Sequence, residues 1–233
     1  MNLKPGWLKR QMESDRQHFS LWPLFFKRIY GKDIESQKYD PLFHLNENNE
    51  YDDNYLDEMY IPKNRDWFFP VKANGIPINL HPGAFGIQRR NKYFHTGIDL
   101  YCKKTDLEVY AVEDGVVHST GQFTGKNIKT PQWNDTEYIM IKGKSGIVCY
   151  GEIETDLNIG DTVQKGQKIA EIIPVLKKGQ EKPDVPGHSR YMLHLELYTE
   201  AEEPIDWRIG CPKPSNLLDP TPCLLDKKLQ ILT

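Results

Sequence analysis

The stretch Tyr138-Ile-Met-Ile-Lys-Gly-Lys-Ser-Gly-Ile-Val-Cys-Tyr150 decides the fold class of this chain of 233 residues. Apolar and β-branched residues dominate both of its halves, and a turn bounded by Gly143 and Gly146 separates them. This pattern predicts two antiparallel strands, 138–141 and 147–150, joined by a tight hairpin.

The segments on either side of this hairpin have the same texture. Residues 109–117 read as strand, Asp114-Gly115 turn and strand, while glycines punctuate the short apolar runs of 159–173. These glycines mark tight corners of a compact β-corner rather than a phosphate-binding loop. The expected fold is therefore mainly β, an antiparallel β-sheet core of sandwich-like or barrel-like form with an N-terminal extension.

Composition divides the chain into an extension and one main domain. We expect a partly helical or irregular extension over 1–65, with an acidic linker at 46–59 that contains six acids and no basic residue. The main domain is expected over 66–233, with an exposed loop at 174–190. Five prolines in 204–233 predict a tail that wraps the domain in extended form.

Bulk properties disfavour several classes of partner. A formal net charge of -3 gives no electrostatic reason to expect nucleic acid. The apolar run 19–26 is too short to span a bilayer and contains Pro23, so no membrane span is predicted. The N-terminus lacks the order of a secretion signal, which leaves localisation open between the cytoplasm and non-classical export to the periplasm or cell wall. Oligomeric state is not readable.

The cysteines do not form a readable metal or redox motif. Cys102, Cys149, Cys211 and Cys223 are widely spaced and never form Cys-x-x-Cys. We expect free structural thiols, with a disulfide between Cys211 and Cys223 as the open alternative.

Candidate chemistry begins with the segment Met192-Leu-His-Leu-Glu-Leu-Tyr198. On a strand its three leucines share one face, so His194 faces the other side and is available to a ligand. A second segment, His95-Thr-Gly-Ile-Asp99, brings an imidazole and a carboxylate four residues apart. Their backbones would lie about 13 Å apart in a straight strand, so one shared ion requires a bend, which Gly97 can supply.

Two imidazoles and one carboxylate are typical of a catalytic zinc site that keeps a position open. Taken alone, His-x-x-x-Asp is common by chance, and a surface hydrogen-bonding pair is the other interpretation of it. The order of motifs along the chain changes this balance. That order is Phe85-Gly86, Arg89, His95-Thr-Gly-Ile-Asp99, 109–117, Tyr150-Gly-Glu-Ile153, 159–169 and Leu193-His-Leu-Glu196.

Over about residues 70–200, this order resembles the lysostaphin-like (LytM-type) zinc metalloendopeptidases. The resemblance implies a β-sheet core with an open groove and a zinc ion, Zn2+, bound by His95, Asp99 and His194. It also implies hydrolysis of peptide cross-links or stem peptides in bacterial peptidoglycan, which would make such a peptide the partner.

The chain departs from this family at two positions. The paired catalytic histidines of the family would fall on Glu152 and Met192. Met192 can neither orient water nor stabilise charge, whereas Glu152 could act as a general base or serve only as a structural carboxylate. His188, in the loop before the last strand, is a candidate substitute electrophile or an ordinary surface histidine. Glu196 is expected to support His194 rather than bind the metal.

Two other functions remain open. A catalytically inactive zinc-binding relative could hold peptidoglycan or a peptide as a binding or regulatory module, and the two lost histidines favour it. A biotinyl or lipoyl carrier shares the Gly-Asp-x-Val turns, but the chain lacks a lysine in the usual setting at a hairpin tip.

Overall fold

The computed structural model describes residues 42–44, 67–73, 75–77, 81–89, 93–128, 130–177, 179–180 and 190–225. Within these residues the chain is almost entirely antiparallel β-sheet with one short helix, as the sequence predicts. The strands are β1 (Leu42–His44), β2 (Gly75–Pro77), β3 (Gln88–Arg89), β4 (Tyr93–Phe94), β5 (Ile98–Tyr101), β6 (Glu108–Tyr110), β7 (Gly115–Thr124), β8 (Thr136–Gly143), β9 (Gly146–Glu154), β10 (Thr162–Val163), β11 (Lys168–Ile172), β12 (Met192–Tyr198), β13 (Trp207–Arg208) and β14 (Leu217–Leu218), and the helix is α3 (Thr221–Leu225).

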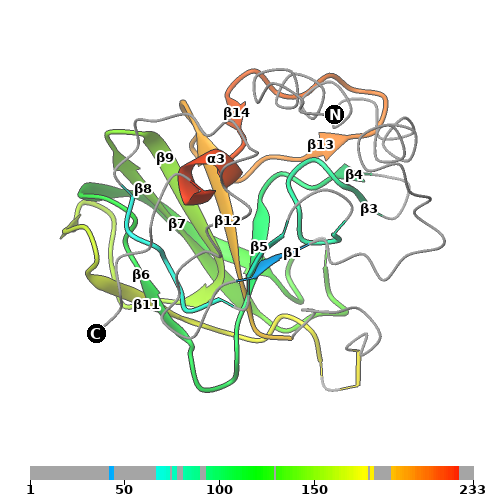
Figure 1. Ribbon diagram of the computed structural model, residues 1–233, viewed down its shortest axis with the longest axis horizontal. Helices are drawn as coiled ribbons and strands as arrows, with labels where there is room; N and C mark the ends of the chain where they lie inside the picture. Colours follow the sequence, from blue (N-terminus) through cyan, green and yellow to red (C-terminus); the bar gives the residue numbers. More distant parts are fainter. Residues whose placement is uncertain are drawn as a thin grey trace, which may run out of the picture.

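A nine-stranded sheet forms the body of the protein. Its main path runs β10-β7-β8-β9-β11-β6, and β12 pairs with β9, β5 and β14 beside it. Figure 1 shows β7, β8, β9 and β12 running through the centre of the molecule. The hairpin predicted around Gly143 and Gly146 is confirmed as β8 and β9, whose ladder closes on the pair Gly143 and Gly146.

Both faces of this sheet are covered, which explains why β12 is buried along its whole length. The three leucines of β12 enter the larger core with Ile139 and Tyr150. Tyr198 belongs to a second cluster with Cys149 and Trp207, on the opposite face. Alternation along β12 thus places His194 away from the leucines, as predicted.

The ladder shifts register at four places in the sheet, and two of these bulges lie next to the row of paired residues that contains His194. On β7 the register shifts between Gln122 and Thr124, which leaves Phe123 outside the ladder. On β9, Gly151 pairs with Tyr138 and the next paired residue is Ile153, which leaves Glu152 as the extra residue. Bulges bend a strand and re-aim side chains.

Two sequence expectations are refined. The strands at 108–110 and 115–124 exist, but they pair with β11 and with β8 and β10 rather than with each other. The tail is not extended throughout, because 221–225 forms a helix that begins where Asp219 accepts a hydrogen bond from the backbone N–H of Thr221. A carboxylate two residues before such a donor is a frequent helix start.

Most of the predicted extension, including 46–59, lies outside the described residues, so the boundary near residue 65 stays a prediction. β1 is the described part of that extension, and it pairs antiparallel with β2. The four cysteines are free thiols, and only Cys211 is exposed. Among the described helices, none combines the length and apolar character that a bilayer crossing requires.

Candidate metal centre

His95 and Asp99, four residues apart, meet the distant His194 on the face of the sheet opposite the larger core. His95 follows β4, Asp99 lies in β5, and His194 lies in β12 directly opposite Asp99 in the ladder. The chain bends at Gly97, which shortens the span between His95 and Asp99 as predicted. A Cβ on Gly97 would lie 2.5 Å from the carbonyl oxygen of Leu195, so glycine also permits this close approach.

The donor atoms of these residues face one another. Asp99 Oδ1 lies 3.1 Å from His95 Nε2 and 2.9 Å from His194 Nδ1. The two ring nitrogens are 3.1 Å apart. Tetrahedral zinc at about 2.0–2.1 Å from each donor places its ligands roughly 3.3 Å from one another, so this triangle fits such an ion after a small expansion. In the described part of the chain, these residues form the group suited to holding a metal.

Neighbouring groups determine which ring nitrogen is bare. His95 Nδ1 lies 2.9 Å from the carbonyl oxygen of Ala84, which only accepts, so Nδ1 carries the proton and Nε2 is free to ligate. His194 Nε2 lies 3.0 Å from Glu196 Oε1, which leaves Nδ1, facing Asp99, as the candidate ligand atom. Hydrogen bonds of this kind are the usual means of orienting metal-binding histidines.

Glu196 is itself held in place. Its Oε1 accepts a hydrogen bond of 2.5 Å from the hydroxyl of Thr96, and its Oε2 accepts one of 2.6 Å from Tyr198. The carboxyl is buried, and burial acts to raise its pKa. The hydrogen bond with His194 is the largest of the effects that lower this pKa below its ordinary value. An ionised, fully hydrogen-bonded carboxylate therefore supports His194, in agreement with the supporting role expected for Glu196.

Arg89 completes the surroundings of Asp99. Its Nη2 donates to Asp99 Oδ2 at 2.5 Å and to the carbonyl of Pro82 at 2.5 Å. One carboxylate oxygen is thereby occupied, and Oδ1 remains for a metal. The sequence predicts no role for Arg89 beyond its place in the order of motifs. Its pairing with Asp99 arises because residues 82–89 fold against β5.

Electrostatics favour one additional positive charge in this cluster. Burial would raise the pKa of Asp99, but His95 and Arg89 hold it well below its usual range. Burial and Arg89 lower the pKa of His95 to about 4. Burial also acts to lower the pKa of His194, but its hydrogen bonds to Asp99 and Glu196 outweigh burial and raise the pKa to about 10. The site therefore favours either a proton on His194 or a metal cation.

Glu152 lies at the β9 bulge beside this cluster. Its φ of 67° lies in the left-handed region, and among the described residues no other residue except glycine has such a backbone. The carboxyl is buried, and within the described residues its Oε2 has no hydrogen-bond partner. Burial and the negative charge of Asp99 raise the pKa of Glu152 to about 8. A strained backbone and an unpaired buried carboxyl both cost stability, a combination concentrated at functional sites.

Met192 and His188 are the other two positions that the sequence places near the chemistry, and the structure describes only Met192. Met192 is buried in a small apolar cluster with Tyr101 and Val175. Its thioether therefore packs rather than offering a proton donor. His188 lies outside the described residues, so its suggested role stays a prediction.

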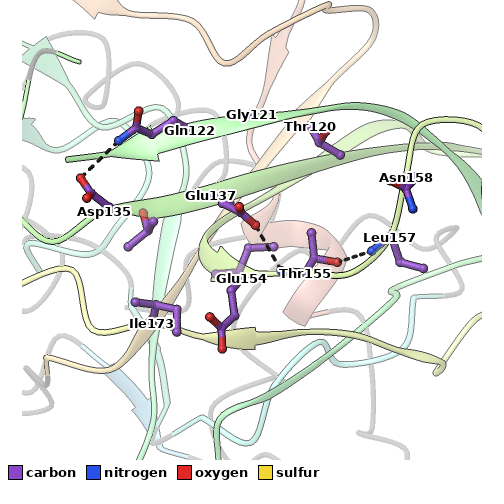
Figure 2. A pocket seen from close by; sticks show the side chains of 12 residues that line it. Thr120, Gly121, Gln122, Asp135, Glu137, Glu154, Thr155, Leu157, Asn158 and Ile173 are labelled. Atoms are coloured by element: carbon purple, nitrogen blue, oxygen red, sulfur yellow. Dashed lines mark hydrogen bonds between the residues drawn. The ribbon is translucent and has the colours of Figure 1, made fainter. Parts of the chain in front are cut away.

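A separate hollow of about 590 Å³ lies elsewhere on the sheet. Figure 2 shows Thr120, Gln122 and Glu137 around it, with a hydrogen bond between the Glu137 carboxylate and the backbone N–H of Thr155. Thr120 and Gln122 flank Gly121 on β7, and Gly121 pairs with Tyr138 in the row that carries His194. The alternation of strand residues therefore places this hollow on the face away from the metal cluster.

Replacing Glu196 tests the support of His194. We expect Glu196→Gln to weaken zinc binding about 10–100-fold, because the amide cannot accept from His194 and both hydroxyls as the carboxylate does. A competitive titration against a zinc chelator measures this, with exposed Glu200→Gln as the matched control. Equal affinity of the two variants would remove Glu196 from the support of the site.

The model of peptidase family M23 matches residues 93–207. CbpA of L. salivarius REN is similar in structure, with 18% identity over 66% of this chain and 92% of that chain and a TM-score of 0.43. Csd3 of Helicobacter pylori shows 21% identity over 71% of this chain and 39% of that chain, with a TM-score of 0.37.

A zinc-containing peptidase of Vibrio cholerae shows 21% identity over 70% of this chain and 44% of that chain, with a TM-score of 0.38. The chain thus spans less than half the length of this peptidase and of Csd3. No curated protein matches the chain.

Proposed function

Because residues 93–207 of this chain belong to peptidase family M23, we propose that the protein is a zinc-dependent endopeptidase that hydrolyses peptide bonds. His95, Asp99 and His194 are the proposed zinc ligands. The observation that carries this proposal is the triangle of converging donor atoms, with distances of 2.9 to 3.1 Å, on one side of a buried sheet.

Zinc at these donors supplies Lewis-acid polarisation of a scissile carbonyl and acidification of water. The residues of the chain prepare the site for it. Ala84 and Glu196 orient the two imidazoles, and Arg89 directs one oxygen of Asp99 toward them. Each contact fixes a donor before any metal arrives, so little reorganisation is required on binding.

Glu152 is our candidate for the general base. Its unpaired Oε2 is free to accept a proton from the attacking water, and its bulge carries the side chain out of the regular ladder. A positive charge bound at the neighbouring donors would favour the carboxylate form and so lower the pKa of Glu152 from about 8 toward the range of a useful base. His188 remains a second proposed participant.

We propose peptide cross-links or stem peptides of bacterial peptidoglycan as the substrate. Zinc-loaded protein incubated with purified peptidoglycan should release soluble muropeptides and new amine ends, both detected by chromatography and mass spectrometry. Protein stripped with a chelator should release none until zinc is restored. Stoichiometric zinc without any new amine ends would refute the peptidase and favour the alternative below.

The alternative is a zinc-binding module that holds peptidoglycan or a peptide without cutting it. Its support is the pair Glu152 and Met192 at the positions of the family's catalytic histidines, with Met192 packed into an apolar cluster. Co-sedimentation with peptidoglycan in the absence of cleavage, lost when zinc is removed, would identify this function.

A further inference from the structure

Phe123 is an aromatic side chain at the metal cluster that the proposed chemistry does not use. It occupies the β7 bulge between Gln122 and Thr124, and its half-buried ring reaches across β8 and β9 to His194 on β12. The ring centroid lies 5.2 Å from that of His194, with an interplanar angle of 37°. No polar atom of Phe123 explains this placement, so its contribution to the site is apolar surface.

Two glycines make this crossing possible. A Cβ on Gly151 would lie 2.7 to 2.9 Å from three atoms of the Phe123 ring, so the ring rests directly on that backbone. Tyr138 lies on β8, between β7 and β9, and its ring leans over Gly121 of β7. A Cβ on Gly121 would lie 2.9 Å from that ring. Phe123 and Tyr138 then meet edge to face, with centroids 6.4 Å apart. The two rings form a continuous apolar surface next to His194.

The order of neighbours across the sheet places this surface relative to the donors. One row of the ladder runs Asp99, His194, Gly151, Tyr138 and Gly121. The ligands lie at its β5 and β12 end, and Gly151 has no side chain to fill the adjoining position. A group held at the metal and extending toward β9 therefore meets the ring of Phe123.

We propose that Phe123, supported by Tyr138, is the apolar wall of a substrate subsite and selects an uncharged, apolar side chain next to the scissile bond. The inference rests on the proposed zinc peptidase function. A polar side chain against this ring would lose water without gaining a hydrogen bond, whereas an apolar one buries surface that is otherwise wet.

Amino acid hydroxamates test this subsite by binding rather than by turnover. Leucine and asparagine have nearly the same shape and differ in polarity, so hydroxamates of N-acetyl-leucine and N-acetyl-asparagine form a matched pair. A second pair, with the hydroxamate on a malonyl group coupled to each amino acid amide, probes the other side of the scissile bond. Calorimetric titration of zinc-loaded protein gives the affinities, with acetohydroxamate as the reference.

In one of the two series, we expect leucine to bind at least about tenfold more tightly than asparagine. Phe123→Leu should keep this ratio of leucine to asparagine affinity, because the wall stays apolar. Phe123→Gln introduces a polar side chain similar in size to leucine and should reduce the ratio below about threefold. The matched control is Phe68→Ala, because Phe68 is a half-buried phenylalanine that packs on Tyr110 away from the site.

A phenylalanine hydroxamate keeps the test decisive should the Gln variant fail to fold. Its affinity should fall about threefold to tenfold in Phe123→Leu, because ring stacking is lost, while the leucine probe is unchanged. The subsite is overturned where neither series prefers leucine, or where both substitutions leave the ratios as in the wild type. Failure of acetohydroxamate to bind zinc-loaded protein would instead overturn the proposed zinc site itself.

Discussion

Asp99→Asn should abolish stoichiometric zinc binding and all zinc-dependent hydrolysis, the largest effect expected from one substitution. The amide removes the negative charge that sits 2.9 Å from His194 Nδ1 and 3.1 Å from His95 Nε2. Loss of a ligand should exceed the roughly 10–100-fold typical of a supporting residue, so we expect zinc affinity to fall on the order of 10³-fold or more. Elemental analysis and chelator competition measure it.

The same substitution should destabilise the metal-free protein. Arg89 donates to Asp99 Oδ2 at 2.5 Å, and an amide leaves this guanidinium without its counter-charge. Breaking such a pair from one side costs about 3–5 kcal/mol when both groups are buried, and less here because the Arg89 side chain is 35% exposed. Asp106→Asn is the matched control, because the Asp106 carboxylate makes a loose contact of 3.8 Å with Lys72 and accepts an exposed hydrogen bond of 3.2 Å from the Thr105 hydroxyl, outside the buried cluster. Wild-type zinc content in Asp99→Asn would refute the ligand assignment.

Glu152→Gln should lower kcat about 10²–10⁴-fold while zinc content stays stoichiometric. The amide has the same shape but cannot accept a proton from water. Glu154→Gln, an exposed carboxylate two residues further along the same strand, is the control. Undiminished turnover in Glu152→Gln would remove this residue from the mechanism.

A stability measurement on metal-free protein supplies an independent readout for Glu152. Its folded pKa of about 8 is above its ordinary value of 4.5, so the folded state binds this proton more tightly than the unfolded state. The stabilising contribution is complete below the ordinary value and is lost as the pH rises through about 8. Relative to Glu152→Gln, the wild type should therefore lose on the order of 1–3 kcal/mol between pH 5 and 8 in urea unfolding. Parallel curves for the two proteins would contradict this.

Local features of the fold follow from the sequence because their contacts are local. The hairpin of β8 and β9 depends on neighbours joined by the turn between Gly143 and Gly146, and alternation alone gives the two faces of β12. The pairing of β6 with β11 joins strands far apart in sequence, and no pattern within either strand specifies that choice. The bulges have the same limitation, since each is defined only by the register of a partner strand.

The candidate site shows the same division. His95, Asp99 and His194 can be selected from residue type, a bend and the order of motifs, and the structure brings their donor atoms together. The roles of Arg89 and Phe123 could not be read in advance, because each depends on where a bend or bulge directs a side chain across other strands. Glu152 was suggested by alignment with a motif, while its lack of a hydrogen-bond partner emerges only from packing.

The left-handed backbone at position 152 determines which residues can replace Glu152 beside the candidate metal centre. Asparagine, aspartate and histidine are the residues other than glycine that adopt such a conformation most readily. A single replacement there could therefore exchange one proton-transferring group for another without remodelling the strands around it. The fold thus keeps an adaptable position beside the three proposed ligands, and the proposed catalytic ability could be gained or lost at that position while the strands around it stay unchanged.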